Sequence, residues 1–565
     1  MRRYWFTLQS QNHICINMQH KRTLTFVMLL ATTLLTSCSW TKKADLVLHN
    51  GVIYTVDNGF NVVEAMAVRN GKIIAIGHND DILHEYQATE VVDLNGQAVY
   101  PGFIDAHCHF FGYASDLVKC DLYNTKSFDE VLNKVIDYSK TNTFSWILGH
   151  GWDQNDWEQK EFPTKSKLDS LFPNTPVYLM RIDGHAVLCN QIALDKAGIT
   201  AATKTSGGEI LLVNGQPSGI LIDNAVDLVK SKIPPFGNDM HEKALIQAQQ
   251  NCFAVGLTTV DDAGLGKDSI QLIHDMQKSG KLKIRVYAMF SDEQKTREHF
   301  FQHGPVKTER LTVRAIKVYA DGALGSRGAC LKKPYSDQPG HYGFLLNSTK
   351  YMKEIADEAL ENGFQVCTHA IGDSAVSVVM KIYADHLNGE NNRRWRIEHC
   401  QVVDPKDHNY FSDYSIIPSV QPTHATSDMY WAEERLGKSR IANAYAYKEL
   451  KDEAGNLIVF GTDFPVEDIN PIYTFYAATE RKDLHGEPSG GFQPENKMKK
   501  KDALKAMTIW AAYSNFEEEE KGSLEEGKVA DFVILDQDIM KVDGDKIPKT
   551  SVVATYVNGE KVYSK

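Results

Sequence analysis

Short apolar segments alternate with polar, turn-forming residues at the two ends of the chain. Asn50-Gly51 and Asn70-Gly71 each stand between segments in which apolar and polar residues alternate. Asn-Gly in this setting is a strong signal for a β-hairpin. The same pattern returns after residue 530, where the predicted strands have no partner nearby in the sequence. We therefore expect residues 44–100 and 522–565 to pair into one small composite domain, a β-sandwich.

Between these ends, apolar runs alternate with longer segments of helical periodicity. This alternation is the pattern of β/α units around a parallel sheet. Eight runs are present, and eight parallel strands close a barrel of the TIM type. They end near residues 109, 262, 290, 321, 369, 399, 421 and 463. We therefore predict an α/β fold in which residues 101–521 form a (β/α)8 barrel.

The connection between the first two expected barrel strands is too long for a βα loop. It runs from about residue 110 to 250 and holds two further strand-like runs, 146–153 and 177–185. We expect this insertion to form a cap over the C-terminal mouth of the barrel, which is where barrels of this type carry their active sites.

The first 38 residues have the pattern of an export signal. Lys21-Arg22 precede an apolar run, 24–35, which is too short to span a bilayer and leads into Thr36-Ser37-Cys38. This order of charge, apolar run and small residues is typical of a secretory signal peptide. A buried N-terminal helix with an incidental cysteine is the alternative.

Residues 35–38 resemble a bacterial lipobox. The resemblance implies that the protein is exported, that Cys38 is lipidated, and that this lipid anchor is the only contact with a membrane. Ser39 next to the cysteine favours the outer membrane. Translation could start at Met1 or at Met18, which stands closer to the apolar run.

Composition narrows the range of partners. A formal net charge of −12 argues against a nucleic-acid partner, because nucleic acids require a basic surface. The nine cysteines include no Cys-x-x-Cys pair, so we expect free thiols and no disulfide framework. We expect a small-molecule substrate, and leave open whether the protein is a homodimer.

Polar side chains end several of the expected barrel strands. His107 and His109 lie two residues apart, so on a strand both face the same side and can reach one ion. The C-terminal ends of barrel strands meet at one site. The residues brought together in this way are His107, His109, Lys317, His369, His399 and Asp463.

These residue types suit one or two divalent cations. Imidazole and carboxylate are ligands for zinc, our first expectation, and also for manganese, iron or nickel. Lys317 would repel a cation while it is an ammonium, but burial beside cations lowers the pKa of a lysine, and CO2 could then convert the amine to a bridging carbamate. The alternative is a lysine that reaches solvent or pairs with Asp321.

As a set, these motifs resemble the amidohydrolase superfamily, and more narrowly its amidohydrolase-3 branch, which includes YtcJ-like proteins and N-substituted formamide deformylase. The resemblance covers nearly the whole chain after the signal. Its motifs are Phe103-Ile-Asp-Ala-His-Cys-His, Ile316-Lys-Val-Tyr-Ala-Asp-Gly-Ala-Leu-Gly-Ser-Arg, Thr368-His-Ala-Ile-Gly-Asp, Arg396-Ile-Glu-His and Gly461-Thr-Asp-Phe-Pro, with Gly151-Trp-Asp and Asp183-Gly-His in the expected cap.

The resemblance implies a ligand set and a reaction. His107 and His109 would bind the more buried metal with Asp463, and His369 and His399 would bind a second metal bridged by carboxylated Lys317. The reaction would be hydrolysis of a non-peptide C–N bond by a metal-activated hydroxide. Asp463 would act first as general base and then as general acid.

Other residues are candidates for the substrate pocket. In the cap these are His185, as an oxyanion stabiliser or orienting group, together with Trp152 and Asp153, although all three could instead pack the cap on the barrel. Residues that follow barrel strands could line the pocket or orient the metal ligands, namely Asp321, Arg327 and Gln421. Glu398, next to His399, is expected to point to the opposite face of its strand and to be structural.

Fold and metals do not decide the chemistry. An isomerase, a deaminase or an esterase on the same barrel is one alternative to the amide hydrolase. A non-catalytic surface-binding lipoprotein is another, although the presence of every inferred ligand and of Asp463 argues against it.

Overall fold

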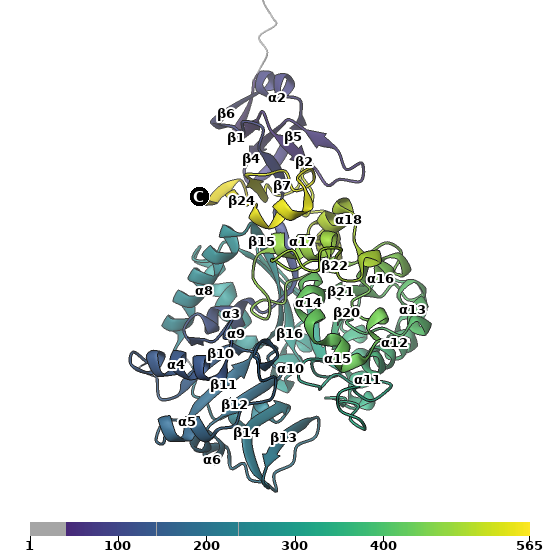
Figure 1. Ribbon diagram of the computed structural model, residues 1–565. Coiled ribbons are helices and arrows are strands. Elements are labelled where there is room, and N and C mark those ends of the chain that lie inside the picture. The colour runs from purple at the N-terminus through teal and green to yellow at the C-terminus, as the bar shows by residue number, and fades with distance from the viewer. Residues whose placement is uncertain (1–40, 143, 236) are drawn as a thin grey trace, which may run out of the picture.

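Three regions follow one another along the molecule in the computed structural model, which describes residues 41–142, 144–235 and 237–565. A β domain lies at one end, a barrel in the middle and a cap at the other end (Figure 1). The proposed signal peptide and Cys38 lie outside the described residues. Within the described ranges, no helix has the length and apolar character needed to cross a membrane.

The β domain consists of two packed sheets and contains both ends of the described chain. The first sheet has the order β5 (Lys72–Gly77), β4 (Ala65–Arg69), β1 (Lys42–His49) and β6 (Tyr86–Asp93), with α2 (Asn79–Glu85) beside it. The second has the order β25 (Glu560–Ser564), β24 (Val552–Val557), β23 (Phe532–Leu535), β7 (Ala98–Pro101), β2 (Val52–Tyr54) and β3 (Val62–Val63). Antiparallel pairing of β23 with β7 joins the two ends of the chain, which confirms the composite β domain.

All eight expected barrel strands are present, each parallel to its neighbour in the sheet. They are β8 (Phe103–Cys108), β15 (Leu257–Leu265), β16 (Arg285–Ser291), β18 (Leu311–Tyr319), β19 (Gln365–Ala370), β20 (Arg396–His399), β21 (Ile417–Val420) and β22 (Val459–Phe460). These strands are buried on both faces, which explains why they are continuous apolar runs in the sequence.

The barrel closes between its first and last strands through a few specific contacts. The N–H of Asp463 donates to the carbonyl of His107 over 2.8 Å, and the Thr462 hydroxyl donates to Asp105 over 2.7 Å. Gly461 permits this approach, because a Cβ there would lie 2.5 Å from the His107 backbone. The closure thus places Asp463 beside the histidines of β8.

Helices surround the barrel (Figure 1), and they include α9 (Lys267–Lys278), α10 (Gln294–His303), α11 (Thr349–Glu361), α12 (Asp373–Leu387), α16 (Tyr447–Glu453), α17 (Pro471–Glu480), α18 (Lys500–Ala506) and α19 (Ile509–Ser514). One of them corrects the expected extent of the cap. Helix α8 (Asn238–Ala254) falls within the predicted insertion but belongs to the barrel, because its residues Leu245, Ala248 and Cys252 are fully buried in the barrel core.

The cap is a separate layer inserted between β8 and β15. Its sheet has the order β13 (Gly208–Val213), β14 (Gln216–Asp223), β12 (Ala186–Cys189), β11 (Val177–Arg181), β10 (Ile147–Trp152) and β9 (Cys120–Asp121). Two apolar clusters flank this sheet, one including Trp152 and the other Val187. They contain side chains from α4 (Phe128–Ser139), α5 (Ser166–Leu171), α6 (Gln191–Ala197) and α7 (Val226–Lys230). The cap therefore has its own core on both faces of the sheet.

Candidate metal centre and substrate pocket

Three buried side chains converge at the C-terminal end of the barrel. Ligand atoms of His107, His399 and Asp463 all lie within 4.8 Å of one another. A fourth group, His109, follows β8 and places its Nε2 3.2 Å from Oδ1 of Asp463. Strands far apart in the sequence thus bring imidazoles and a carboxylate to one point, as the fold of a TIM barrel requires.

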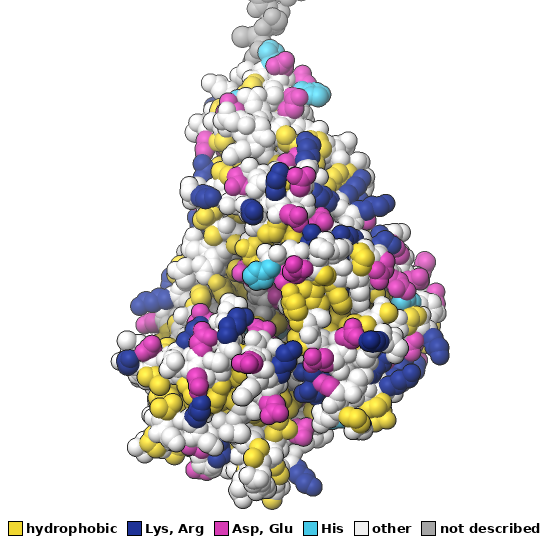
Figure 2. All heavy atoms as spheres, in the orientation of Figure 1, with side chains coloured by type: hydrophobic (Ala, Val, Ile, Leu, Met, Phe, Trp, Pro, Cys, Tyr) yellow, Lys and Arg dark blue, Asp and Glu magenta, His cyan; other side chains and the backbone are white. Residues whose placement is uncertain are grey.

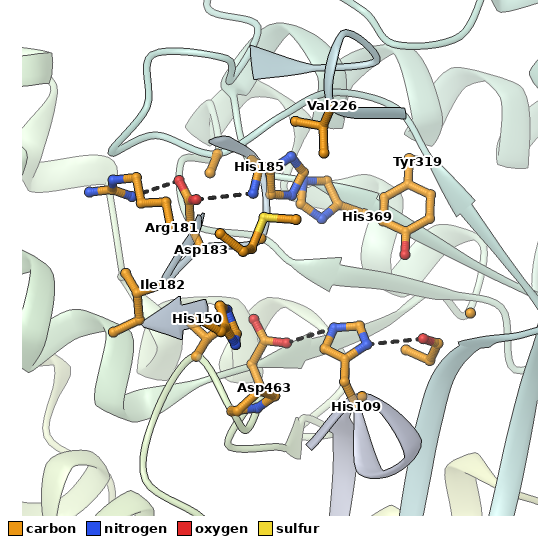
Figure 3. Close-up of a pocket in the computed structure, with 18 of the residues that line it drawn as sticks. His109, His150, Arg181, Ile182, Asp183, His185, Val226, Tyr319, His369 and Asp463 are labelled. Atoms are coloured by element: carbon orange, nitrogen blue, oxygen red, sulfur yellow. Dashed lines mark hydrogen bonds and ion pairs between the residues drawn. The ribbon is translucent and has the colours of Figure 1, made fainter. Parts of the chain in front are cut away.

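The rings of this centre are oriented by bonds to their other nitrogen. Nδ1 of His107 lies 2.5 Å from the carboxylate of Glu398. Nδ1 of His109 lies 3.0 Å from the carbonyl oxygen of Ala263 (Figure 3), and Nδ1 of His399 lies 2.8 Å from Oε1 of Gln421. Since these partners accept hydrogen bonds, each Nδ1 carries the proton, which leaves the Nε2 lone pair free to bind a cation.

Glu398 does more than the sequence suggested. It is fully buried and accepts a hydrogen bond from Nε of Arg396 over 2.7 Å as well as contacting His107. Burial alone would raise the pKa of this carboxyl group, but the Arg396 guanidinium and the His107 ring hold it well below its usual range. Glu398 therefore stays an acceptor and fixes the tautomer of His107. Its neighbour His399 has φ +76°, so the strand ends there.

The environment keeps the histidines neutral. Burial lowers the pKa of His107 to about 4. Burial also holds the pKa values of His369 and His399 well below the usual range. Asp463 is ionised instead. Burial would raise the pKa of its carboxyl group, but the imidazoles of His109, His107 and His399 beside it hold this pKa well below the usual range. Neutral imidazoles around a carboxylate are the protonation states that a divalent cation needs.

One further observation indicates that this centre can hold a divalent cation. Oδ1 of Asp463 is buried and has no hydrogen-bond partner in the described part of the chain, while Nε2 of His109 and Nε2 of His107 lie 3.2 and 3.6 Å from it. Buried acceptors that converge without a donor between them are costly unless a cation satisfies them.

Lys317 and His369 adjoin this cluster. The Lys317 side chain is buried, and its Nζ lies 3.3 Å from Nε2 of His107. Burial lowers the pKa of this lysine, which favours the neutral amine. The His369 ring is 4.5 Å from the His399 ring, measured between centroids. All six sequence-predicted metal ligands are therefore at one end of the barrel.

A cavity of about 1110 Å3 extends from this centre to the cap. The surface of the face shown in Figure 2 is hollowed between the barrel and the cap. Barrel residues such as His109 and Asp463 line the cavity together with cap residues such as His185 (Figure 3). Asp153 of the cap lines it as well. The cavity is thus bounded by candidate metal ligands on the barrel side and by polar residues on the cap side.

Two of the cap candidates face this cavity. Nδ1 of His185 lies 2.6 Å from Oδ1 of Asp223, and its ring centroid is 5.1 Å from that of His369. Although burial would lower it, contact with Asp223 raises the pKa of His185, which favours the imidazolium. Asp153 forms an ion pair with buried Arg181, so its charge is balanced within the cap.

The other pocket candidates do not line the cavity. Trp152 is 1 % exposed and packs in the cap core, where its indole N–H donates to the carbonyl of Leu179 over 2.8 Å. Arg327 pairs with Asp337. Asp321 accepts backbone N–H groups of Cys330, Ile371 and Gly372, which joins the loops after β18 and β19. Gln421 instead contacts the candidate metal ligand His399.

The sequence reasoning missed His150, which lines the cavity from the cap. His150 and Trp152 are two residues apart, so regular alternation would place both on one face of β10. A β-bulge between them, with Gly151 at φ +109°, turns His150 towards the cavity and Trp152 into the core. The run Gly149-His150-Gly151 was the available signal, since glycines inside a strand mark bulges.

Comparison with known proteins agrees with this architecture. The sequence profile of the amidohydrolase family matches residues 90–563. The chain is 34% identical to Protein LONG AFTER FAR-RED 3 of Arabidopsis thaliana, over 92% of each chain. It is 32% identical to the putative amidohydrolase YtcJ of Bacillus subtilis, over 92% of this chain and 99% of that one. N-substituted formamide deformylase of Arthrobacter pascens is 27% identical, over 92% and 98%.

A solved structure extends the similarity to the fold. An uncharacterized metal-dependent hydrolase from Pyrococcus horikoshii superimposes with a TM-score of 0.72 at 27% identity, over 88% of this chain and 99% of that one. The profile match and the relatives above 30% identity each span most of the described chain. The chain therefore belongs to the amidohydrolase-3 family of the amidohydrolase superfamily.

Proposed function

We propose that this metal-dependent hydrolase cleaves a non-peptide C–N bond, in an N-substituted formamide, another N-acyl amine or a cyclic amide. The observation that carries the proposal is the convergence of imidazole nitrogens on Oδ1 of Asp463, which has no hydrogen-bond partner among the described residues, at the base of the cavity under the cap. The similarity to N-substituted formamide deformylase over 92% of the chain supports the substrate class.

The chain offers ligands for up to two cations, zinc first among them. His107 and His109 would hold one with Asp463, and His369 and His399 the other. Lys317, buried with a lowered pKa and 3.3 Å from His107, is the amine that CO2 would convert to a bridging carbamate. A divalent cation, when bound, polarises a carbonyl group and makes a water molecule more acidic.

Proton transfer falls to Asp463. Its carboxylate is ionised, and no group within the described residues satisfies its Oδ1, so this oxygen can take a proton from the attacking water. The same oxygen then delivers this proton to the leaving nitrogen as the tetrahedral intermediate collapses. His185, held by Asp223 and favoured as an imidazolium, is suited to stabilise the developing oxyanion from the cap side.

The test is purification with added zinc or manganese, followed by a screen of N-formyl, N-acyl and cyclic amides, each paired with the corresponding ester. Turnover of amides by the metal-loaded protein is the expected result. Turnover of esters alone, or deamination or isomerisation without hydrolysis, would contradict the proposed reaction while keeping the metal centre. Protein without bound metal after supplementation would favour a non-catalytic binding protein.

We also propose that the protein is exported and anchored by a lipid on Cys38, on the evidence of residues 18–38 alone. The test is expression of the full chain in a bacterium with labelled palmitate, beside a Cys38→Ser variant. Label in the outer-membrane fraction that disappears in the variant is expected. Unlabelled protein in both cases would contradict the anchor.

A further inference from the structure

Tyr319, the last residue of β18, presents a hydroxyl group to the cavity. Its side chain is half-buried and lines the cavity, and in Figure 3 its ring lies beside that of His369 while its hydroxyl group points towards the side where His109 lies. This hydroxyl has no hydrogen-bond partner within the described ranges of the chain, and its oxygen is accessible rather than buried. It is therefore available to a ligand in the cavity.

The alternation of side chains along β18 places Tyr319 at the metal centre. Lys317 and Tyr319 are two residues apart, so their side chains leave the same face of the strand. Nζ of Lys317 lies 4.8 Å from the centre of the Tyr319 ring, and the centre of the His369 ring lies 5.6 Å from it. The tyrosine ring thus packs against two candidate metal ligands, and only its hydroxyl group extends beyond them.

Gly264, near the end of β15, leaves room for this hydroxyl group. A Cβ atom at Gly264 would lie 3.2 Å from the hydroxyl oxygen of Tyr319, which is a tight contact. Gly264 also lines the cavity and has φ +89°, a conformation that favours glycine. The hydroxyl oxygen therefore lies on the cavity wall, between the C-terminal ends of β15 and β18.

The hydroxyl group of Tyr319 is a neutral hydrogen-bond donor. Burial raises the pKa of this phenol above its ordinary value, so it does not ionise near neutral pH. A phenol in this state can donate its O–H to an oxygen atom without giving up the proton. Such a donor stabilises negative charge that develops on an oxygen atom during a reaction.

We propose that Tyr319 is a catalytic residue whose hydroxyl group donates a hydrogen bond to the substrate oxygen that becomes the oxyanion. Water adds to the carbonyl carbon and gives a proton to Asp463, while the π electron pair moves onto this oxygen. When the C–N bond breaks, the C=O bond forms again, and the nitrogen keeps the bonding pair and takes the proton from Asp463. Tyr319 retains its own proton throughout.

The substrate oxygen would then have one donor from the barrel and one from the cap. In Figure 3 the His369 ring lies between Tyr319 and His185, and its centre is 5.6 Å from the first ring and 5.1 Å from the second. Two donors around one oxygen are the usual composition of an oxyanion hole. This inference rests on the proposed hydrolase function and deepens it.

The test compares a planar amide with a tetrahedral anion. Acetanilide is the amide, and N-phenyl methylphosphonamidate carries a tetrahedral, negatively charged centre in place of the carbonyl group. The affinity of the zinc-loaded full chain for each is measured by calorimetry. Tyr319→Phe removes the hydroxyl group and keeps the ring beside Lys317 and His369. We expect this variant to lose about tenfold to a hundredfold in affinity for the phosphonamidate and less than about threefold for acetanilide.

Controls separate the hydroxyl group from the fold and the metal. Tyr342→Phe, the same change at an exposed tyrosine of the barrel, should keep the wild-type affinities. Equal affinity of wild type and Tyr319→Phe for the phosphonamidate, including no measurable affinity in either, overturns the proposal. Loss of zinc from Tyr319→Phe would make the tyrosine a support for Lys317 and also overturns it. Thermal melting confirms that each variant is folded.

Turnover separates this inference from the proposed function. In Tyr319→Phe, kcat should fall about tenfold to a hundredfold with KM nearly unchanged, because the hydrogen bond strengthens only as charge develops. Weaker phosphonamidate binding in this variant, although even wild type hydrolyses no amide, would support the role of Tyr319 and contradict the proposed hydrolysis. Amide hydrolysis with the same kcat in both proteins would contradict the role of Tyr319 alone.

Discussion

The imidazoles of the barrel and those of the cap are held in different ways. In the barrel, the ring of His107 is oriented by Glu398 of β20 and the ring of His399 by Gln421, which follows β21, and both rings are nearly inaccessible to solvent. In the cap, His150 and His185 each contact a carboxylate of the cap or its approach, Asp116 and Asp223. One set lies at the metal centre, and the other lies in the cap, where both residues line the cavity.

This difference indicates that the barrel and the cap have different roles. Burial in the barrel lowers the pKa values of His107 and His399, so they remain neutral ligands. In the cap, the carboxylate of Asp223 instead raises the pKa of His185, which favours an imidazolium that donates hydrogen bonds. We therefore expect changes in the barrel to alter metal binding or chemistry, and changes in the cap to alter substrate recognition with the metal in place.

The largest effect is expected at Asp463. In Asp463→Asn the side chain can no longer accept the proton from the attacking water, and kcat should fall about a thousandfold. The four histidines remain, so metal content measured by inductively coupled plasma mass spectrometry should stay at the wild-type level. Asp413→Asn, on the surface of the barrel in α13 (Asn409–Asp413), is the matched control. Full activity of Asp463→Asn would remove the residue from the mechanism.

The corresponding cap variant, His185→Phe, should lose about a hundredfold in kcat, because it removes a donor from the oxyanion. Its metal content should be unchanged, since His185 is held by Asp223 and not by the metal centre. Kinetics and metal analysis of the same preparation provide the measurement. Loss of metal from this variant would break the division between barrel and cap.

Glu398→Gln tests whether bonds to Nδ1 support metal binding. The variant keeps the shape of the side chain but loses the charge that fixes the tautomer of His107, so metal affinity should fall about tenfold to a hundredfold. Competition with a chromogenic chelator measures this affinity. Because Arg396 also loses a buried partner, a melting curve must show that the protein is folded at the assay temperature. Unchanged affinity in folded protein would contradict the role of Glu398.

Asp223→Asn should move the pH dependence of the reaction. Asp223 raises the pKa of His185, so the imidazolium, and the activity that depends on it, is present below this pKa and disappears as the pH rises through it. Without the carboxylate charge, the basic limb of kcat/KM should shift by about one pH unit or more towards lower pH. A basic limb that stays in place would mean that another group controls it.

The smallest effect is expected in the core of the cap. Trp152→Phe removes the indole N–H that donates to Leu179, which should lower the free energy of unfolding by about 1 kcal/mol, with some further loss from the smaller ring. Chemical denaturation measures this change. Since Trp152 does not line the cavity, kcat/KM should remain near the wild-type value at temperatures where the protein is folded. A large loss of activity in folded protein would mean that Trp152 contributes to the substrate pocket.

The strands and their order were accessible from the sequence because they depend on local patterns. A barrel strand is buried on both faces and therefore reads as a continuous apolar run, and Asn70-Gly71 marks the hairpin of β4 and β5. The hairpin predicted at Asn50-Gly51 was wrong, because this turn leads from β1 in one sheet to β2 in the other. The same reasoning put His107 and Asp463 at the ends of the first and last strands, where the structure places them. The sequence pattern of α8 did not show that this helix packs on the barrel, because the pattern of a helix does not identify the element against which it packs.

The sequence by itself determined the fold class, the composite β domain and the residue types available to hold a metal, since burial periodicity and ligand chemistry are properties of short segments. Only the tertiary structure decided which nitrogen of each ring is free. Glu398 contacts His107 although the two residues are 291 positions apart in the sequence, and one bulge at Gly151 places His150 and Trp152 on opposite faces of the sheet. Such pairings arise from barrel closure and from backbone irregularities, and neither follows from the alternation of apolar and polar residues.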